Sequence, residues 1–481
     1  MLARDARRPI FAALEHSHPH IAMADIARYL QANRARHRAE LDEFLRIPSI
    51  SAKSEHRDDM RRTAEWLVDR MMEAGLQTAE TMPTGGHPAV IGEWRGAPDA
   101  PTLLIYGHYD VQPPEPLDEW TSPPFEPTER DGRLYARGSV DDKGQIYLHL
   151  KAVETYIAEH GALPVNVVFL VEGEEEIGSA HLEEFLVQNR ERLACDAVLI
   201  SDTTMFAPGL PSITVGLRGL AYMEVKVQGP RTDLHSGVYG GAVVNPANAL
   251  AQIIAALRDD EGRVTIPGFY DDVRELDEEE RAEIRKLPFR EEGLREEVGS
   301  PELAGERGYS SLERVWARPT LDVNGLLSGY TGEGAKTVLP AKAMAKISMR
   351  LVPDQDFREI ERLFSEHVRS IAPAGVTVVV EALHGGQPWR ADPDAPIFAA
   401  AERALARAFG REPVYIREGG SIPIVQAFQS TFNAPIVLLG FGLPGENAHA
   451  PDEWLSLENF HTGTLAIALF YEELANGGGV R

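Results

Sequence analysis

Imidazole and carboxylate side chains gather in five short stretches of the sequence. These are "GHYD" (His108, Asp110), "RGSVDDKG" (Asp141, Asp142), "EGEEE" (Glu174, Glu175, Glu176), "SD" (Asp202) and "NAHAP" (His449). Three consecutive glutamates repel one another, so a positive group in front of them would stabilise the stretch. Imidazoles and carboxylates, in a chain without a set of cysteines, are suited to Zn²⁺, Mn²⁺ or Co²⁺. The residue types therefore indicate a site for divalent cations, and two cations would neutralise the cluster.

The stretches lie next to segments that we predict to be buried strands or helices. Nearly continuous apolar runs predict strands at 101–108, 164–173, 196–202 and 435–442, and helical periodicity predicts helices at 58–74, 142–160, 180–190, 397–409 and 457–474. This alternation is typical of an α/β fold with a mainly parallel sheet that helices cover on both faces. Ligands bind beyond the carboxyl ends of such strands. Since all four strand ends carry a candidate ligand, we expect them to meet at one edge of the sheet.

The hydrophobic pattern changes in the middle of the chain. Segments 221–229 and 341–352 alternate apolar and polar residues, as half-exposed strands do, and a helix is expected after Asn245. We predict an α+β open-faced sandwich at 213–388, inserted into a catalytic α/β domain made of 23–212 and 389–481. Residues 259–320 are dense in charge and predict a solvated helical insertion, and 1–22 predict a loose N-terminal extension.

Composition and charge limit the partners. The formal net charge is −26, with 48 Lys+Arg against 74 Asp+Glu. So strong an acidic excess disfavours nucleic acid and anionic membrane surfaces as partners. The sequence has no apolar run long enough to span a membrane, and its single cysteine, Cys195, cannot form an intrachain disulfide. We therefore expect a cytoplasmic location.

Eight motifs, taken in order, resemble those of the M20 family of di-metal peptidases. They are "GHYDV", "RGSVDDKG", "EGEEEIGS", "ISD", "DLHSGVYGG", "SMRLVPDQ", "REGGSIPI" and "NAHAPDE". The likeness is greatest to the carnosinase-like, non-specific dipeptidase branch and covers about residues 23–481. It implies a di-zinc peptidase-like fold whose inserted domain serves as a lid and a dimerisation domain, and it implies a homodimer.

The resemblance also implies a ligand set for two divalent metal ions per chain, Zn²⁺, Mn²⁺ or Co²⁺. His108 and Asp202 would hold one metal ion, and Glu176 and His449 would hold the other. Asp141 would bridge both, and the peptide bond that follows it would be cis. A closed structural metal site is the less favoured alternative, because it would need no additional glutamate.

Three further residues have catalytic roles by the same resemblance. Glu175 would be the general base, taking a proton from a water shared by the two metals and handing it to the departing amine. Asp110 would fix the ring of His108. His235 would reach across a dimer interface and donate to the oxyanion of the intermediate; without the surrounding motif it would be an ordinary loop histidine. Glu174 has no assigned role.

Four residues are candidates for binding the substrate. Arg350 lies on the polar face of an alternating strand and can bind a carboxylate in bidentate fashion. A surface arginine paired with a nearby acid is the alternative. Backbone N–H groups of Gly420 and Ser421, before a predicted helix, can bind an anion. The resemblance adds His384 and assigns all four to the free carboxylate of a dipeptide substrate.

Two other functions remain open at this point. One is an N-acyl amino acid deacylase or carboxypeptidase of the same superfamily; by the resemblance, Asp rather than Glu at position 202 favours a dipeptidase. The other is a non-catalytic binding protein that keeps the fold. Glu175 and all five metal positions are present, and their presence favours an enzyme.

Overall fold

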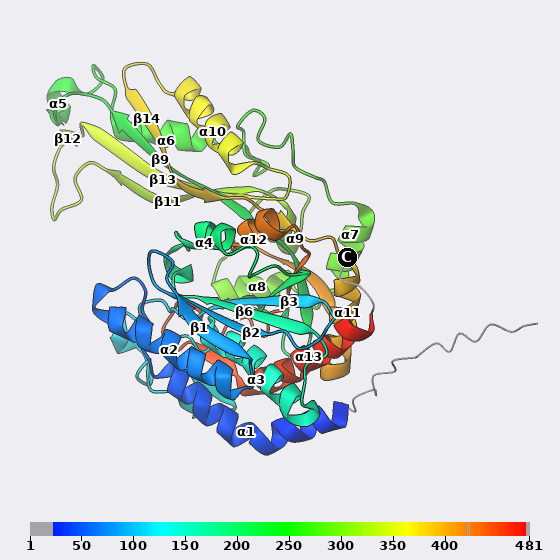
Figure 1. Cartoon of the computed structure of the whole chain (residues 1–481). Coiled ribbons are helices and arrows are strands. Elements are labelled where there is room, and N and C mark those ends of the chain that lie inside the picture. Colours follow the sequence, from blue (N-terminus) through cyan, green and yellow to red (C-terminus); the bar gives the residue numbers. More distant parts are fainter. Residues whose placement is uncertain (1–22, 421, 423, 478–481) are drawn as a thin grey trace, which may run out of the picture.

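Two large β-sheets organise the computed structural model, which describes residues 23–477 apart from 421 and 423 (Figure 1). At the centre of the nine-stranded sheet, four parallel strands lie side by side in the order β6 (Asn166–Glu172), β3 (Thr102–His108), β7 (Ala197–Ile200) and β17 (Ile436–Leu438). These are the four predicted strands. The outer strands are β1 (Thr78–Met82), β2 (Ala89–Trp94), β8 (Ser212–Leu217), β15 (Trp389–Arg390) and β16 (Val414–Glu418). The predicted α/β fold with a mainly parallel central sheet is confirmed.

Helices cover both faces of this sheet because its strands are apolar on both sides. Leu103 and Ile105 of β3 lie in one hydrophobic cluster, whereas Leu104 and Tyr106 lie in another on the opposite face. The first cluster includes helices α1 (Met23–Leu45), α2 (Arg57–Glu73), α3 (Lys143–His160), α11 (Pro396–Phe409) and α13 (Leu457–Asn476). The second includes α4 (Leu182–Gln188) and α12 (Ile424–Phe432), which lie on the side of the small sheet (Figure 1).

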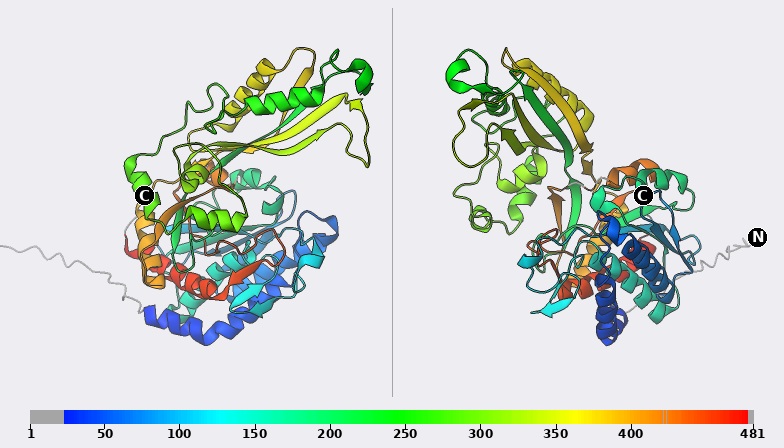
Figure 2. Two further views of the ribbon diagram at one scale, coloured as in Figure 1. Left: turned by 180° about the vertical axis from the view of Figure 1, so that it is seen from behind. Right: turned by 90° about the vertical axis from the view of Figure 1, so that its left-hand side faces the viewer.

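The second sheet is antiparallel and has a helical layer on one face. Its strands follow the order β11 (Thr320–Ser328), β13 (Lys342–Leu351), β9 (Gly219–Gln228) and β14 (Thr377–Gly386). Alternate residues of β9, such as Met223 and Val225, pack against helices α6 (Pro246–Ala256) and α10 (Phe357–Ile371). The residues between them lie on the opposite, partly exposed face. The predicted open-faced sandwich is therefore present, and it stands apart from the large sheet in three views (Figures 1 and 2).

The junction between the two sheets differs from the prediction by a few residues. The insertion predicted from residue 213 onward includes most of strand β8, but β8 pairs with β16 and β17 in the large sheet. The chain crosses to the small sheet at Arg218, directly before β9. The apolar run of β8 indicates a strand but not the sheet to which the strand belongs. The division into domains is otherwise a prediction, and 1–22 lie outside the described residues.

The charged segment 259–320 is only partly solvated. It contains three short helices, α7 (Glu278–Lys286), α8 (Glu291–Val298) and α9 (Ser311–Ala317). Trp316 of α9 and Leu287 are buried against Ile416 of β16, so this segment also packs against the edge of the large sheet. These few apolar residues could not be recognised as buried from the sequence, because charged residues surround them. Every helix in the described part of the chain is too short or too polar to cross a membrane.

Candidate metal centre and active site

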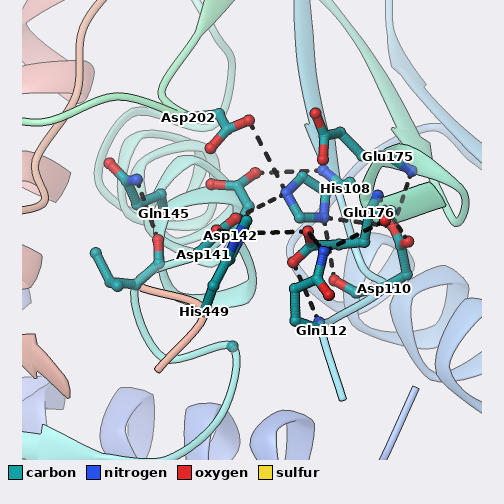
Figure 3. Close-up of polar contacts among 12 residues, drawn as sticks. His108, Asp110, Gln112, Asp141, Asp142, Gln145, Glu175, Glu176, Asp202 and His449 are labelled. Carbon is teal, nitrogen blue, oxygen red and sulfur yellow. Dashed lines mark hydrogen bonds and ion pairs between the residues drawn. The ribbon is translucent and has the colours of Figure 1, made fainter. Parts of the chain in front are cut away.

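The carboxyl ends of the central strands bring the predicted ligands together (Figure 3). His108 is the last residue of β3, and Asp202 follows β7 by two positions. Glu175 and Glu176 begin the short 3₁₀ turn Glu175–Ile177 after β6. Asp141 lies in the loop before α3, and its peptide bond to the next residue is cis, as predicted.

Five side chains form two groups that share Asp141. His108 Nε2 lies 3.1 Å from Asp141 Oδ1 and 3.9 Å from Asp202 Oδ2. His449 Nε2 lies 2.8 Å from Asp141 Oδ2 and 3.2 Å from Glu176 Oε2. In each group, the potential ligand atoms of the three residues all lie within 4.8 Å of one another. One imidazole nitrogen and two carboxylate oxygens per group fit a divalent cation, and the groups coincide with the two ligand sets that the resemblance implies.

The electrostatics of the two groups favour positive charge. Burial raises the pKa of Asp202 to about 7, and the charge of Asp141 adds to this shift. Burial alone would also raise the pKa of Asp141, but hydrogen bonds from the rings of His108 and His449 outweigh it and lower that pKa. The hydrogen bonds of His449 with Asp141 and Glu176 raise the pKa of its ring to about 10. Cations bound by the same atoms would supply the compensating charge that the protonated rings supply here.

Asp110 connects the ring of His108 to the glutamate turn. His108 Nδ1 lies 3.0 Å from the backbone oxygen of Asp110 and 3.4 Å from its Oδ1. The carboxylate of Asp110 also accepts the backbone N–H groups of Glu175 at 3.2 Å and Glu176 at 3.1 Å. Both His108 and Asp110 are fully buried. Asp110 therefore leaves Nε2 of His108 facing Asp141 and also fixes the start of the turn.

Glu175 lies beside the two groups without belonging to either. Burial raises the pKa of its carboxyl group well above the usual range; the charge of His108 opposes this shift, and those of Asp202 and Asp141 add to it. A carboxyl group with a raised pKa is a stronger base than an ordinary glutamate and can therefore accept a proton more readily. Figure 3 shows its side chain on the same side of the His108 ring as Asp202. The position of Glu175 suits proton transfer to and from a molecule that is bound between the two metal-ligand groups.

Gln112, which is not among the predicted site residues, contacts Glu176 directly. Its Nε2 donates to Glu176 Oε2 at 2.8 Å and to the backbone oxygen of Glu176 at 3.3 Å, and its backbone N–H donates to Oε1 at 3.2 Å. A signal was present in the sequence, since residues 108, 110 and 112 point to one side of an extended chain. Gln112 thus orients the carboxylate that faces His449.

Glu453 is a second functional residue that we did not predict. Its Oε2 accepts from Arg137 Nη1 at 2.7 Å and from the N–H of Gly138 at 2.9 Å. Its Oε1 accepts from the N–H groups of Val140 at 3.0 Å and Asp141 at 3.2 Å. The side chain is completely buried. Glu453 therefore holds the loop that carries Asp141, although it lies only four positions after His449 in a motif already noted.

Glu174, the first of the three glutamates, is a member of neither metal-ligand group. Its Oε2 lies 2.7 Å from Nδ1 of His181, and the side chain is buried. A Cβ atom at Gly86 would lie 1.9 Å from Glu174 Oε1, so only glycine leaves room for the carboxylate there. Glu174 therefore packs the start of the turn Glu175–Ile177 against the loop around Gly86.

His235 lies far from the two groups within one chain. It belongs to the short strand β10 (Leu234–His235), pairs with β12 (Val338–Leu339) and is exposed. Its Nδ1 accepts the N–H of Gly237 at 3.0 Å. Helix α5 (Ser236–Tyr239), which follows directly, lies at the outer end of the small sheet in all views (Figures 1 and 2). Within one chain, the structure does not bring His235 to the active site.

The predicted substrate-binding residues lie in both parts of the fold. Arg350 is half-buried on β13, and burial lowers the pKa of its guanidinium. His384 is exposed on β14, with its ring 4.9 Å from that of Tyr222. Gly420 follows β16 and precedes α12. Ser421 lies outside the described residues.

The sequence comparison identifies the family. Residues 104–473 match the family described as Peptidase family M20/M25/M40. The chain belongs to this family. The resemblance to the M20 family, which the motifs indicate, is confirmed.

Individual M20 relatives match nearly the whole chain. The Cys-Gly metallodipeptidase dug1 of Schizosaccharomyces pombe is 34% identical over 452 residues, which are 91% of this chain and 95% of that protein. The structure of human carnosine dipeptidase 1 is similar with a TM-score of 0.81 and 30% identity, covering 94% of this chain and 99% of that one. The structure of the M20 family metallo-carboxypeptidase Sso-CP2 from Sulfolobus solfataricus is similar with a TM-score of 0.80 and 36% identity, covering 92% of this chain and 99% of that one.

Proposed function

We propose that this chain is a metallodipeptidase, which hydrolyses the peptide bond of dipeptides at a site for two divalent cations. The observation that carries the proposal is the pair of ligand groups joined by Asp141, with Glu175 beside them. The names of two M20 relatives, a Cys-Gly metallodipeptidase and a carnosine dipeptidase, support a dipeptide as substrate.

Each proposed ligand and catalytic residue has a distinct task. His108 and Asp202 would hold one cation, Glu176 and His449 would hold the other, and Asp141 would be shared by both. Bound cations would polarise the amide carbonyl and lower the pKa of a water between them. Glu175 takes the proton of that water and hands it to the departing amine nitrogen. Asp110 keeps the ring of His108 in place during the reaction.

The small sheet and the turn after β16 bind the carboxylate end of the substrate in this proposal. Arg350 pairs with the carboxylate, and the N–H of Gly420, the ring of His384 and Ser421 complete its surroundings. A carboxylate site one residue away from the scissile bond selects dipeptides. His235 donates to the oxyanion in the site of a second chain of a homodimer, because it cannot reach the site of its own chain.

The cofactors and the location are further parts of the proposal. Zn²⁺, Mn²⁺ and Co²⁺ all suit a set of imidazoles and carboxylates, so the metal must be determined by reconstitution. A cytoplasmic location rests on the sequence, in which one cysteine is compatible with a reducing compartment.

The test is hydrolysis by the purified protein, stripped of metal and reloaded with Mn²⁺ or Zn²⁺. The substrates are free dipeptides together with their N-acetylated and C-amidated counterparts, and Glu175→Gln serves as the control. We expect cleavage of the free dipeptides only, with loss of activity but not of bound metal in Glu175→Gln. Metal-loaded protein that leaves every free dipeptide intact would refute the proposal.

A carboxypeptidase is the second candidate, because the carboxypeptidase from Sulfolobus solfataricus is 36% identical. It would release the last residue of N-acylated dipeptides, which the same panel detects. Preference for the N-acetylated compounds would replace the dipeptidase by a carboxypeptidase or deacylase. A non-catalytic role is disfavoured, since Glu175 and all five proposed ligands are present.

A further inference from the structure

Arg218 connects the crossover between the two sheets to the glycine turn after β16. Its backbone N–H donates to the carbonyl oxygen of Gly420 at 3.1 Å. Its Nε donates to the carbonyl oxygen of Gly419, also at 3.1 Å. One residue at the junction with the small sheet therefore binds two successive carbonyl groups of a turn in the large sheet.

These two bonds set the direction of the turn's N–H groups. In a trans peptide group, the carbonyl and the following N–H point in opposite directions. Because the carbonyl of Gly419 faces Arg218, the N–H of Gly420 points away from it. A Cβ atom at position 419 would lie 2.8 Å from Arg218 Nη2 and 3.0 Å from a methyl group of Val315, so glycine allows this approach.

Arg218 also lies close to Arg350. Leu220, two positions after Arg218, is paired with Arg350 across β9 and β13, and residues two apart in an extended chain point to the same side. Burial lowers the pKa of Arg218 to about 10, the positive charge of Arg350 adds to this shift, and Asp322 opposes it. Two guanidinium groups in one partly buried region favour an anion beside them.

We propose that Arg218 is a positioning residue of the carboxylate site: it aims the N–H of Gly420 and sets the place of the turn relative to Arg350. This inference rests on the proposed function, in which the same turn and Arg350 bind the carboxylate of the dipeptide. Arg218 joins these two parts, which come from different sheets. The preference for a free carboxylate over an amide therefore depends on Arg218.

The experiment compares Arg218→Lys and Arg218→Met with the unmodified protein. For each, kcat and KM are measured on one free dipeptide and on its C-amidated form, together with the bound metal. We expect KM for the free dipeptide to rise by about 10- to 100-fold, the factor for losing a hydrogen bond to a charged group, with little change in kcat. The ratio of free to amidated cleavage should fall by a similar factor, and the metal content should stay the same.

Two further variants separate positioning from folding. Gly419→Ala should displace Arg218 and lower the same ratio while leaving the arginine in the chain. Arg417→Met is the matched control, because Arg417 lies two positions before Gly419 and its guanidinium binds Glu280 at 2.7 Å. It should lower thermal stability without changing the ratio. If the Arg218 variants change stability in the same way and leave the ratio intact, the inference is overturned.

Binding measurements keep the inference separate from the proposed function. The dissociation constants of the free and the amidated dipeptide are measured by calorimetry on Glu175→Gln protein, with and without Arg218→Lys. A preference for the free dipeptide that disappears with Arg218→Lys supports the role of Arg218, even if no dipeptide is hydrolysed. A preference that survives Arg218→Lys overturns that role, even if the protein is a dipeptidase.

Discussion

The replacement Glu453→Gln tests whether a buried acceptor outside the ligand set holds the site together. The carboxylate of Glu453 accepts four hydrogen bonds, two on each oxygen, from Arg137, Gly138, Val140 and Asp141. Glutamine has nearly the same shape but no charge, and one of its oxygens is replaced by an NH₂ group. Whichever way the amide is oriented, this NH₂ group faces two donors and can accept from neither.

The expected loss of stability follows from burial. The side chains of Arg137 and Glu453 are 1% and 0% exposed, so the variant leaves a buried guanidinium without its counter-charge. Removing one partner of such a pair costs about 3–5 kcal/mol. The free energy of unfolding should fall by that amount. Affinity for metal should also fall, by about 10- to 100-fold, because the released loop carries Asp141.

Denaturant unfolding at a fixed metal concentration measures the first effect, and competition with a chromophoric chelator measures the second. Glu446→Gln is a matched control. Glu446 also accepts two backbone N–H groups, from Leu443 at 2.7 Å and Ser456 at 3.0 Å. Burial raises its pKa to about 8, so a neutral amide resembles its form at pH 7. If Glu453→Gln costs no more than Glu446→Gln, the assigned role of Glu453 is wrong.

Three further predictions concern metal affinity and protons. Gln112→Leu should weaken metal binding by about 10- to 100-fold, because Glu176 loses both hydrogen bonds from the Gln112 side chain and keeps only the one from the backbone N–H; chelator competition measures this. Metal binding at pH 7 should release protons, because the pKa of His449 is raised to about 10; calorimetry in buffers of different ionisation enthalpy detects them. Burial lowers the pKa of His149 to about 3 in the folded chain, whereas a histidine in the unfolded chain has a pKa of about 6.5. Between these two pH values, His149 is protonated in the unfolded chain and neutral in the folded one. The free energy of unfolding should therefore decrease as the pH is lowered below 6.5, and His149 contributes at most about 1.4 kcal/mol per pH unit to this decrease. His149→Gln should make the decrease between pH 6.5 and pH 5 less steep.

Each of these predictions has a result that contradicts it. Unchanged metal affinity in Gln112→Leu would mean that Glu176 is oriented by other contacts. A binding enthalpy that is the same in every buffer would mean that His449 is already neutral before metal binds. An unchanged pH slope in His149→Gln would mean that His149, which contacts Ser201 Oγ at 2.7 Å, does not remain neutral in the native state.

The central sheet and the strand ends could be predicted because both depend on local composition. Continuous apolar runs identify strands buried on two faces, and parallel strands deliver the residues after them to one edge. His108 and Asp202 are predictable ligand candidates for this reason. Strand β8 shows the limit of this reasoning: its apolar run identifies a strand, but the choice between the two sheets depends on partners that are remote in sequence.

The residues missed in the sequence act through backbone groups of distant segments. Glu453 binds the N–H of Gly138 across 315 positions, and Arg218 binds the carbonyl of Gly419 across 201. Every residue except proline has a backbone N–H, and every residue has a carbonyl, so these partners leave no trace in the residue types. Gln112 differs, because the alternation through His108 and Asp110 placed it on the correct side of the chain.

The three consecutive glutamates have three different environments, which explains how the fold tolerates them. Glu174 turns toward His181 and is held against Gly86. The carboxylate of Glu176 is held by donors from Gln112 and faces the ring of His449. Burial disfavours the charge of Glu175, as its raised pKa reflects. A glutamate stabilised by its own partners would be a poor proton acceptor, so the two neighbours of Glu175 take the structural contacts while it stays available for proton transfer.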